Sequence, residues 1–186
     1  MSVPEAPLER TDHGLRAAGE GWFVINAREA EWIGEDKFGS GLMFEGGTEF
    51  PQVGINIQVL SPGQPNCYYH GEEAQEGFLV LSGECLLLVE GEERLMRRWD
   101  YAHLPAWTEH VLVGAGDGPC ALLGLGARGE DKQGLIYPVS ELALRHRAGV
   151  EQEAHRGKDA YAGLEPAQPH PYRDGFLPDH GADPQP

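Results

Sequence analysis

The sequence predicts an all-β protein, because short apolar runs recur between residues 22 and 125 and turn-forming residues separate them. Short apolar or alternating runs are typical of β-strands, and clusters of Gly, Pro and Asp between them are typical of turns. Several such runs in succession predict a sandwich or a barrel. The runs cover residues 22–25, 54–60, 78–81, 85–89, 111–113 and 121–125, and a hairpin turn at 90–93 leads into 94–96.

The run 85–89 has no polar position. Such a strand is expected to be covered on both faces. The protein core would cover one face, and either helices or a partner would cover the other. The edge strands of a small open barrel also need covering. We therefore expect a two-fold homodimer, which is the commonest kind of oligomer.

A chain of 186 residues fits one domain with appendages. We expect a flexible N-terminal segment over residues 1–20, because this stretch is polar. The β-barrel is expected over residues 21–128. Residues 129–186 change character and predict a helical segment followed by a Pro-rich tail.

In this last part, Ser140 can cap a helix over residues 141–147 that ends near Gly149. A second helix is expected over residues 151–161. From Pro166 onward the chain is rich in Pro, Asp and His, which predicts an extended or disordered tail. Docking of the tail on the barrel is the alternative, through its apolar residues Tyr172, Phe176 and Leu177.

Composition excludes several classes of function. A formal charge of -16 argues against nucleic acid and against anionic membrane surfaces, which both need Lys and Arg. No apolar run approaches the roughly 20 residues of a membrane span, and residues 1–15 lack the apolar core of a signal peptide. The three cysteines form no Cys-x-x-Cys pair. We therefore expect a reduced, cytoplasmic setting.

Four residues on three strand-like segments form a candidate metal site: His70, Glu72, Glu76 and His110. Side chains alternate between the faces of a strand, so His70 and Glu72 are expected to point the same way. Glu76 and His110 each stand at the start of an apolar run. Imidazole with carboxylate suits one divalent transition metal ion, whether iron, manganese, nickel, cobalt or zinc. An incomplete ligand shell would leave positions open for chemistry.

Two segments that contain these residues resemble the two motifs of the cupin superfamily. The first motif reads Gly, five residues, His-x-His, three or four residues, Glu, six residues, Gly. The chain has His70, then Glu76 and Gly83 at matching places, with Glu72 in place of the second His. Gly63 lies one residue too far from His70 to complete the pattern.

The second motif reads Gly-Asp, a short apolar stretch, Pro-x-Gly, two residues, His. Asp100, Pro105 and His110 stand at matching places, whereas Trp99 and Trp107 replace the two glycines. The resemblance implies a cupin-type double-stranded β-helix, which is a jelly-roll barrel. It also implies a metal inside the barrel, bound by the residues that match the motifs.

Glu72 is the departure that bears on chemistry. A carboxylate can replace an imidazole as a ligand, and it favours a harder metal than a three-His site does. In that case His70, Glu72, Glu76 and His110 would all bind the metal. In the alternative, Glu72 turns away from the metal, the site has three ligands, and Glu72 serves as a catalytic base.

Other polar residues near the motifs are weaker candidates. Asn56 and Gln58 share one strand face and would line the pocket or face solvent. Tyr68 has the parity of His70 and could donate a hydrogen bond to a ligand. Cys67 has the opposite parity and is expected to be structural. His103 is expected to lie outside the site, because the family motif has no ligand at its position.

Two classes of function follow from these expectations. In the first, the protein is a metalloenzyme acting on a small organic molecule, as a dioxygenase or an isomerase. In the second, it is a non-catalytic module that binds or senses a small molecule with the help of the metal. A closed four-ligand tetrahedron would favour the second class, and open positions facing a pocket would favour the first. The fold alone does not decide between them.

Overall fold

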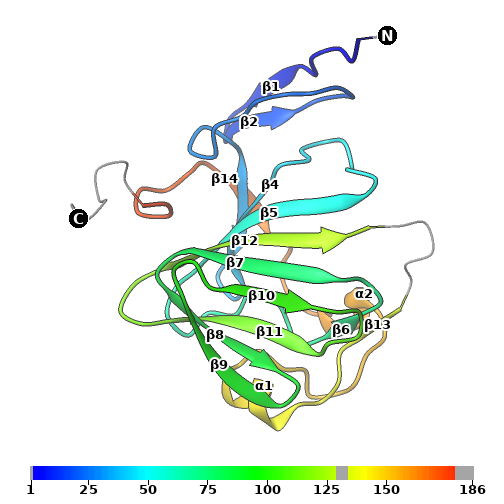
Figure 1. The fold of residues 1–186 in the computed structure, drawn as a ribbon, viewed down its shortest axis with the longest axis vertical. Coiled ribbons are helices and arrows are strands. Elements are labelled where there is room, and N and C mark those ends of the chain that lie inside the picture. Colours follow the sequence, from blue (N-terminus) through cyan, green and yellow to red (C-terminus); the bar gives the residue numbers. More distant parts are fainter. Residues whose placement is uncertain (1, 129–133, 179–186) are drawn as a thin grey trace.

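The computed structural model of the chain describes residues 2–128 and 134–178, and these residues form mostly antiparallel strands (Figure 1). In chain order the strands are β1 (Leu8–Thr11), β2 (Gly14–Ala17), β3 (Trp32–Glu35), β4 (Gly39–Met43), β5 (Val53–Leu60), β6 (Gly71–Glu72), β7 (Glu76–Ser82), β8 (Glu84–Val89), β9 (Glu92–Arg97), β10 (Tyr101–Leu104), β11 (His110–Ala115), β12 (Cys120–Ala127), β13 (Leu135–Ile136) and β14 (Gln168–His170). Helices α1 (Glu141–Arg145) and α2 (Gly157–Ala160) are short. No described helix is long and apolar enough to cross a membrane. The predicted all-β fold class is confirmed.

Two antiparallel sheets form the barrel. The larger has the strand order β10-β7-β12-β5-β4-β3-β14, and the smaller has the order β11-β8-β9. Apolar side chains of both sheets meet in one core, which contains Leu60, Phe78, Val80, Cys85, Leu87, Met96, Leu112 and Leu122. Because side chains alternate along a strand, Leu60 of β5 enters this core while Ile57 and Val59 pack outside with Trp32. Two sheets around one core give the jelly-roll barrel that the resemblance implied.

Most of the predicted strands are present. The runs 54–60, 78–81, 85–89, 111–113 and 121–125 lie in β5, β7, β8, β11 and β12, and 94–96 lies in β9. The prediction of a strand at 22–25 was wrong. Trp22 makes only an isolated bridge with Glu5, and Val24 is 80% exposed. The run therefore lacks the buried face that its apolar composition suggested.

The N-terminal part of the chain adds strands that the apolar pattern did not reveal. β1 and β2 pair as an antiparallel hairpin within the segment 1–20. The hairpin is tied to the chain that follows, because the Leu15 amide donates to the carbonyl of Glu29 at 2.8 Å. β3 and β4 extend the larger sheet beyond β5. The division into segments 1–20, 21–128 and 129–186 stays a prediction.

Helix α1 begins where the sequence predicted. The Ser140 hydroxyl accepts a hydrogen bond from the Ala143 amide at 3.2 Å, which satisfies one of the free amides of the first turn. Leu142 and Ala143 pack against Leu88 and Val111, on the outer face of β8 and β11. The helix, rather than a partner, therefore covers the second face of the apolar run 85–89.

The second predicted helix was wrong over most of its length. Only Gly157–Ala160 is helical within the expected range 151–161. Residues before it run as irregular chain, in which Ala154 bridges Tyr137 in antiparallel fashion. The segment is strongly charged and lacks an apolar stripe, and a short helix without a packed face is marginal in water.

The tail docks on the barrel as far as residue 178. β14 pairs with β3 at the edge of the larger sheet. The Phe176 ring lies 5.1 Å from the ring of Trp32, and the Tyr172 ring lies 6.0 Å from it. The docked alternative is therefore correct for this part of the tail. Residues 179–186 lie outside the described residues.

Both tryptophans that replace motif glycines have left-handed backbone. Trp99 has φ of +76° and Trp107 has φ of +68°. Glycine adopts this region without strain because it has no Cβ, whereas other L-residues do so at a cost of about 1–2 kcal/mol. The chain thus keeps the turn geometry that the motif glycines would allow.

Candidate metal centre

Three donor side chains from three separate segments of the chain meet inside the barrel. His70 directly precedes β6, Glu76 opens β7, and His110 opens β11. A pair of backbone hydrogen bonds aligns the two histidines, at 3.1 Å from the His70 amide and 2.8 Å from the His110 amide. The ligand atoms of all three residues lie within 4.8 Å of one another.

Backbone carbonyls set the orientation of both imidazoles. Nδ1 of His70 lies 2.9 Å from the carbonyl oxygen of Tyr68, and Nδ1 of His110 lies 2.9 Å from that of Thr108. A carbonyl oxygen only accepts, so Nδ1 is the protonated nitrogen in each ring. Each Nε2 then carries a lone pair directed at Glu76. Metal-binding histidines commonly have such an outer partner on the other nitrogen.

The inner atoms of the cluster are buried. Nε2 of His110 lies 3.1 Å from Oε2 of Glu76, and Nε2 of His70 lies 3.8 Å from the same oxygen. His110 is 1% exposed. Although the first distance is short, neither His110 Nε2 nor Glu76 Oε2 makes a hydrogen bond with any described residue. Two atoms that each present a lone pair at this distance are better suited to binding one cation between them than to contacting each other.

Burial lowers the pKa of His70, and the neighbouring His110 lowers it further. Both effects favour the neutral imidazole, which is the form that binds a metal. Glu76 supplies one negative charge beside the two imidazoles. The residues present therefore fit a divalent transition metal.

Glu72 lies in the wall of the same cavity but outside this three-residue cluster. Its main chain is held by β13, where Leu135 is its pairing partner, and by the Trp107 amide, which donates to its carbonyl at 2.7 Å. The role of Glu72, as a ligand or as a catalytic base, stays a prediction.

A cavity of about 630 Å³ adjoins the centre, with His70 and Glu76 in its wall. Asn56 and Gln58 of β5 also line it, so the prediction that this pair faces the pocket is confirmed. Gly126 of β12 leaves space here, because a Cβ at this position would meet nothing nearer than Glu76 Oε1 at 4.0 Å. The cavity offers room for a small organic molecule beside the metal ligands.

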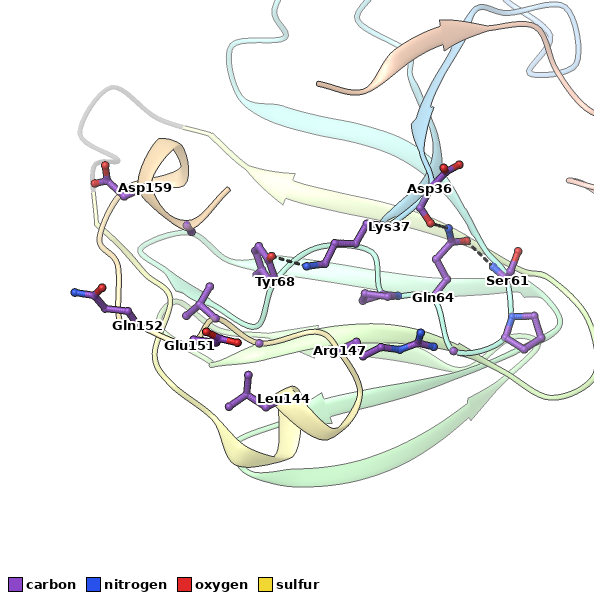
Figure 2. Close-up of a pocket in the computed structure, with 16 residues that line it drawn as sticks. Asp36, Lys37, Ser61, Gln64, Tyr68, Leu144, Arg147, Glu151, Gln152 and Asp159 are labelled. Carbon is purple, nitrogen blue, oxygen red and sulfur yellow. Dashed lines mark hydrogen bonds between the residues drawn. The ribbon is translucent and has the colours of Figure 1, made fainter. Parts of the chain in front are cut away.

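A second and larger cleft, of about 790 Å³, lies between the loop at 61–68 and the C-terminal segment (Figure 2). Some of its polar groups contact one another. Figure 2 shows Lys37 donating to the hydroxyl of Tyr68, and Gln64 bridging Asp36 and Ser61. None of the three clustered residues lines this cleft, whereas His70 and Glu76 line the smaller cavity.

Tyr68 and Cys67 differ from their expected roles. The Tyr68 hydroxyl bonds to Lys37, and it is the Tyr68 carbonyl that contacts His70. Cys67 lines the metal cavity, with Sγ 3.6 Å from His70 Nδ1, so its assignment to the opposite face was wrong. Residues 66–69 do not form a regular strand, and alternation does not apply there. Burial, and then the carboxylate charges of Glu76 and Glu72, raise the pKa of the Cys67 thiol well above its ordinary value.

His103 is exposed on β10 and does not join the cluster, as expected. Sequence reasoning missed Arg128, which lines the cavity although it follows the last predicted strand. Arg128 forms a two-pronged ion pair with the buried Glu45, at 2.6 Å for each oxygen, and lies 3.3 Å from Glu49. No local sequence motif identifies an ion pair whose two residues are so far apart in the sequence.

Comparison with known proteins agrees with this geometry. Residues 56–125 match the model of the cupin domain family. Quercetin 2,3-dioxygenase of Bacillus subtilis is 30% identical over 106 residues, which are 56% of this chain and 28% of that protein. The chain thus spans little more than a quarter of the length of this relative.

Two solved structures are similar to this chain. The polyketide cyclase RemF of Streptomyces resistomycificus aligns with a TM-score of 0.52 and 12% identity, over 61% of this chain and 83% of that one. A sugar phosphate isomerase of the cupin superfamily from Silicibacter pomeroyi aligns with a TM-score of 0.47 and 21% identity, over 80% and 94%. The motif residues, the barrel and the family match together identify residues 56–125 of this chain as a cupin domain.

Proposed function

We propose that this protein is a metal-dependent oxygenase of small organic molecules, with His70, Glu76 and His110 as the metal ligands. The observation that carries the proposal is the donor set itself: two imidazoles and one carboxylate beside a cavity. Two His and one carboxylate with open positions are characteristic of non-haem iron oxygenases. The dioxygenase relative supports the same class of reaction.

Iron bound here would supply a redox centre at which dioxygen and an organic substrate can meet. The residues of the chain provide the remaining functions. The carbonyls of Tyr68 and Thr108 hold the two imidazoles in the required tautomer. The cavity keeps the substrate beside them. Glu72, in the cavity wall, would accept a proton from a substrate hydroxyl and return it to the product.

The test uses anaerobic protein loaded with iron(II) and treated with nitric oxide, which occupies an open iron position as dioxygen would. We expect stoichiometric iron and the electron paramagnetic resonance signal of an iron–nitrosyl centre. His110→Ala should lose both. Parent protein that binds iron but gives no nitrosyl signal would contradict an oxygenase.

The alternative is a non-catalytic module that binds or senses a small molecule, or an isomerase that needs no dioxygen. The place of Glu72 in the cavity wall favours the binding module if this residue closes the shell as a fourth ligand. The nitric oxide experiment separates a closed shell from an open one.

We also propose that the protein is a homodimer and that it is cytoplasmic. The argument for a dimer now depends on the sheet edges, of which β10 is one, because α1 covers the outer face of β8. Light scattering at micromolar concentration tests it, and a mass of one 20.3 kDa chain would contradict it.

A further inference from the structure

The polar groups of the metal cavity indicate the kind of ligand it takes. Oδ1 of Asn56 and Oε1 of Gln58 are buried, and neither makes a hydrogen bond with any residue that the structure describes. Both side chains come from the cavity-facing side of β5. Buried polar atoms are normally paired, so these two amides are suited to hydrogen bonding with a bound molecule.

The charges in the wall disfavour one class of ligand. Four carboxylates line the described part of the cavity, from Glu49, Glu72, Glu73 and Glu76. Arg128 is the cation in that part of the wall, and both of its terminal nitrogens are bound by the carboxylate of Glu45. A ligand carboxylate or phosphate would therefore meet like charges and no available guanidinium.

The shape of the cavity is the third constraint on the ligand. Phe78 supplies an aromatic face, and its ring lies 5.7 Å from the ring of His110. Gly124 is tightly placed, because a Cβ there would come within 2.7 Å of Asn56 Oδ1. The glycine thus lets the Asn56 amide lie close against β12. The two amides and the aromatic ring border one space.

We infer that the cavity binds a neutral molecule with at least two hydroxyl groups, which Asn56 and Gln58 recognise. A hydroxyl both donates and accepts, so it can satisfy the oxygen or the NH2 group of a side-chain amide. A site built around such groups rejects analogues that leave them unpaired. The inference rests on the proposed function only in placing the ligand beside the metal. The substrate class that it names is polyols or phenols rather than organic anions.

Matched probes test the charge preference. Protein loaded with zinc, which has no redox chemistry, is titrated by nuclear magnetic resonance with xylose and resorcinol. The same titration is made with xylose 5-phosphate and with 3,5-dihydroxybenzoate, which keeps both hydroxyl groups of resorcinol. We expect at least one neutral probe to bind about tenfold or more tightly than its anionic counterpart. Comparing the affinity for xylose with the affinity for resorcinol distinguishes a polyol site from a phenol site.

Variants test the two amides. Asn56→Leu and Gln58→Met keep the approximate size of each side chain and remove its hydrogen-bonding groups. Each variant should lower the affinity for the preferred neutral probe about tenfold or more, while the zinc content stays stoichiometric. Gln152→Leu is the control, because Gln152 lines the other cleft. Circular dichroism checks the fold, and the two variants are independent, so one folded variant is sufficient.

Three results would overturn the inference: anions that bind as tightly as their neutral counterparts, no binding of either neutral probe, or unchanged binding in the folded variants. Titrations of protein stripped with a chelator separate this inference from the proposed function. Neutral probes that bind while no metal is taken up would contradict the metal centre alone. Stoichiometric metal without probe binding would contradict the ligand class alone.

Discussion

His110 Nε2 lies 3.1 Å from Glu76 Oε2, and both atoms are buried without a hydrogen bond to any described residue. An unpaired buried carboxylate oxygen is costly. The neutral form of the histidine cannot relieve it, because its single proton is on Nδ1, facing the carbonyl of Thr108. A cation shared by the two atoms would remove this cost, so the relationship supports the proposed metal centre.

Metal binding should therefore stabilise the folded protein. A ligand present at about 100 times its dissociation constant adds roughly 2.7 kcal/mol to the free energy of unfolding. We expect iron(II), manganese or zinc to raise the melting temperature of the parent protein but not that of His70→Ala or His110→Ala. Calorimetry and metal analysis measure both effects. His103→Ala is the matched control, because His103 is exposed on β10. A parent protein whose melting temperature does not respond to any of these metals would refute the centre.

Glu72 and Glu76 should differ when each is changed to Gln. Glu76 belongs to the cluster of ligand atoms, and Glu72 lies only in the cavity wall. Glu76→Gln should weaken metal binding by about tenfold or more, which is roughly 1.4 kcal/mol. Glu72→Gln should keep metal affinity within about twofold, less than roughly 0.5 kcal/mol, and abolish turnover. Isothermal titration distinguishes the two. A large loss of affinity in Glu72→Gln would instead make Glu72 a fourth ligand.

The strands that could be predicted from sequence are those whose apolar side chains enter the core. β8 and β11 are examples, because all of their residues are buried or partly buried. β4 contains two glycines, and β14 contains Pro169, so neither has a periodic apolar signal. These strands form because neighbouring strands are already in place, and that information is not local.

The candidate metal centre likewise has residues that could be predicted from the sequence and residues that could not. His70, Glu76 and His110 could be proposed as neighbours from the sequence because their positions match the two motifs. Cys67 could not be placed, since the chain before His70 is irregular and alternation fails there. Glu45 follows β4 and Arg128 follows β12, so their pairing depends on β4, β5 and β12 lying side by side, which only the sheet order shows.

Trp99 provides a test of backbone strain. Its φ of +76° favours glycine, and its side chain is 63% exposed, so little packing is lost on removing it. Trp99→Gly should be more stable than Trp99→Ala by about 1 kcal/mol, because alanine keeps the strain of the left-handed region. Chemical denaturation measures the difference. At Leu95, an exposed residue within β9, the order should be reversed, with alanine the more stable. Alanine equal to or better than glycine at position 99 would show that the backbone there is not strained.

The docked tail should contribute to stability through Phe176. Its ring packs on Trp32, which is completely buried, while the other three tryptophans of the chain are each at least half exposed. Phe176→Ala should lower the free energy of unfolding by about 1–2 kcal/mol, because the side chain is only partly buried. It should also expose Trp32, so acrylamide should quench a larger fraction of the fluorescence. Val24→Ala is the control, since Val24 is an exposed apolar residue, and it should change stability by less than about 0.5 kcal/mol. If Phe176→Ala matches this control in both stability and quenching, the tail does not hold Trp32 in solution, and β14 alone would account for its attachment to β3.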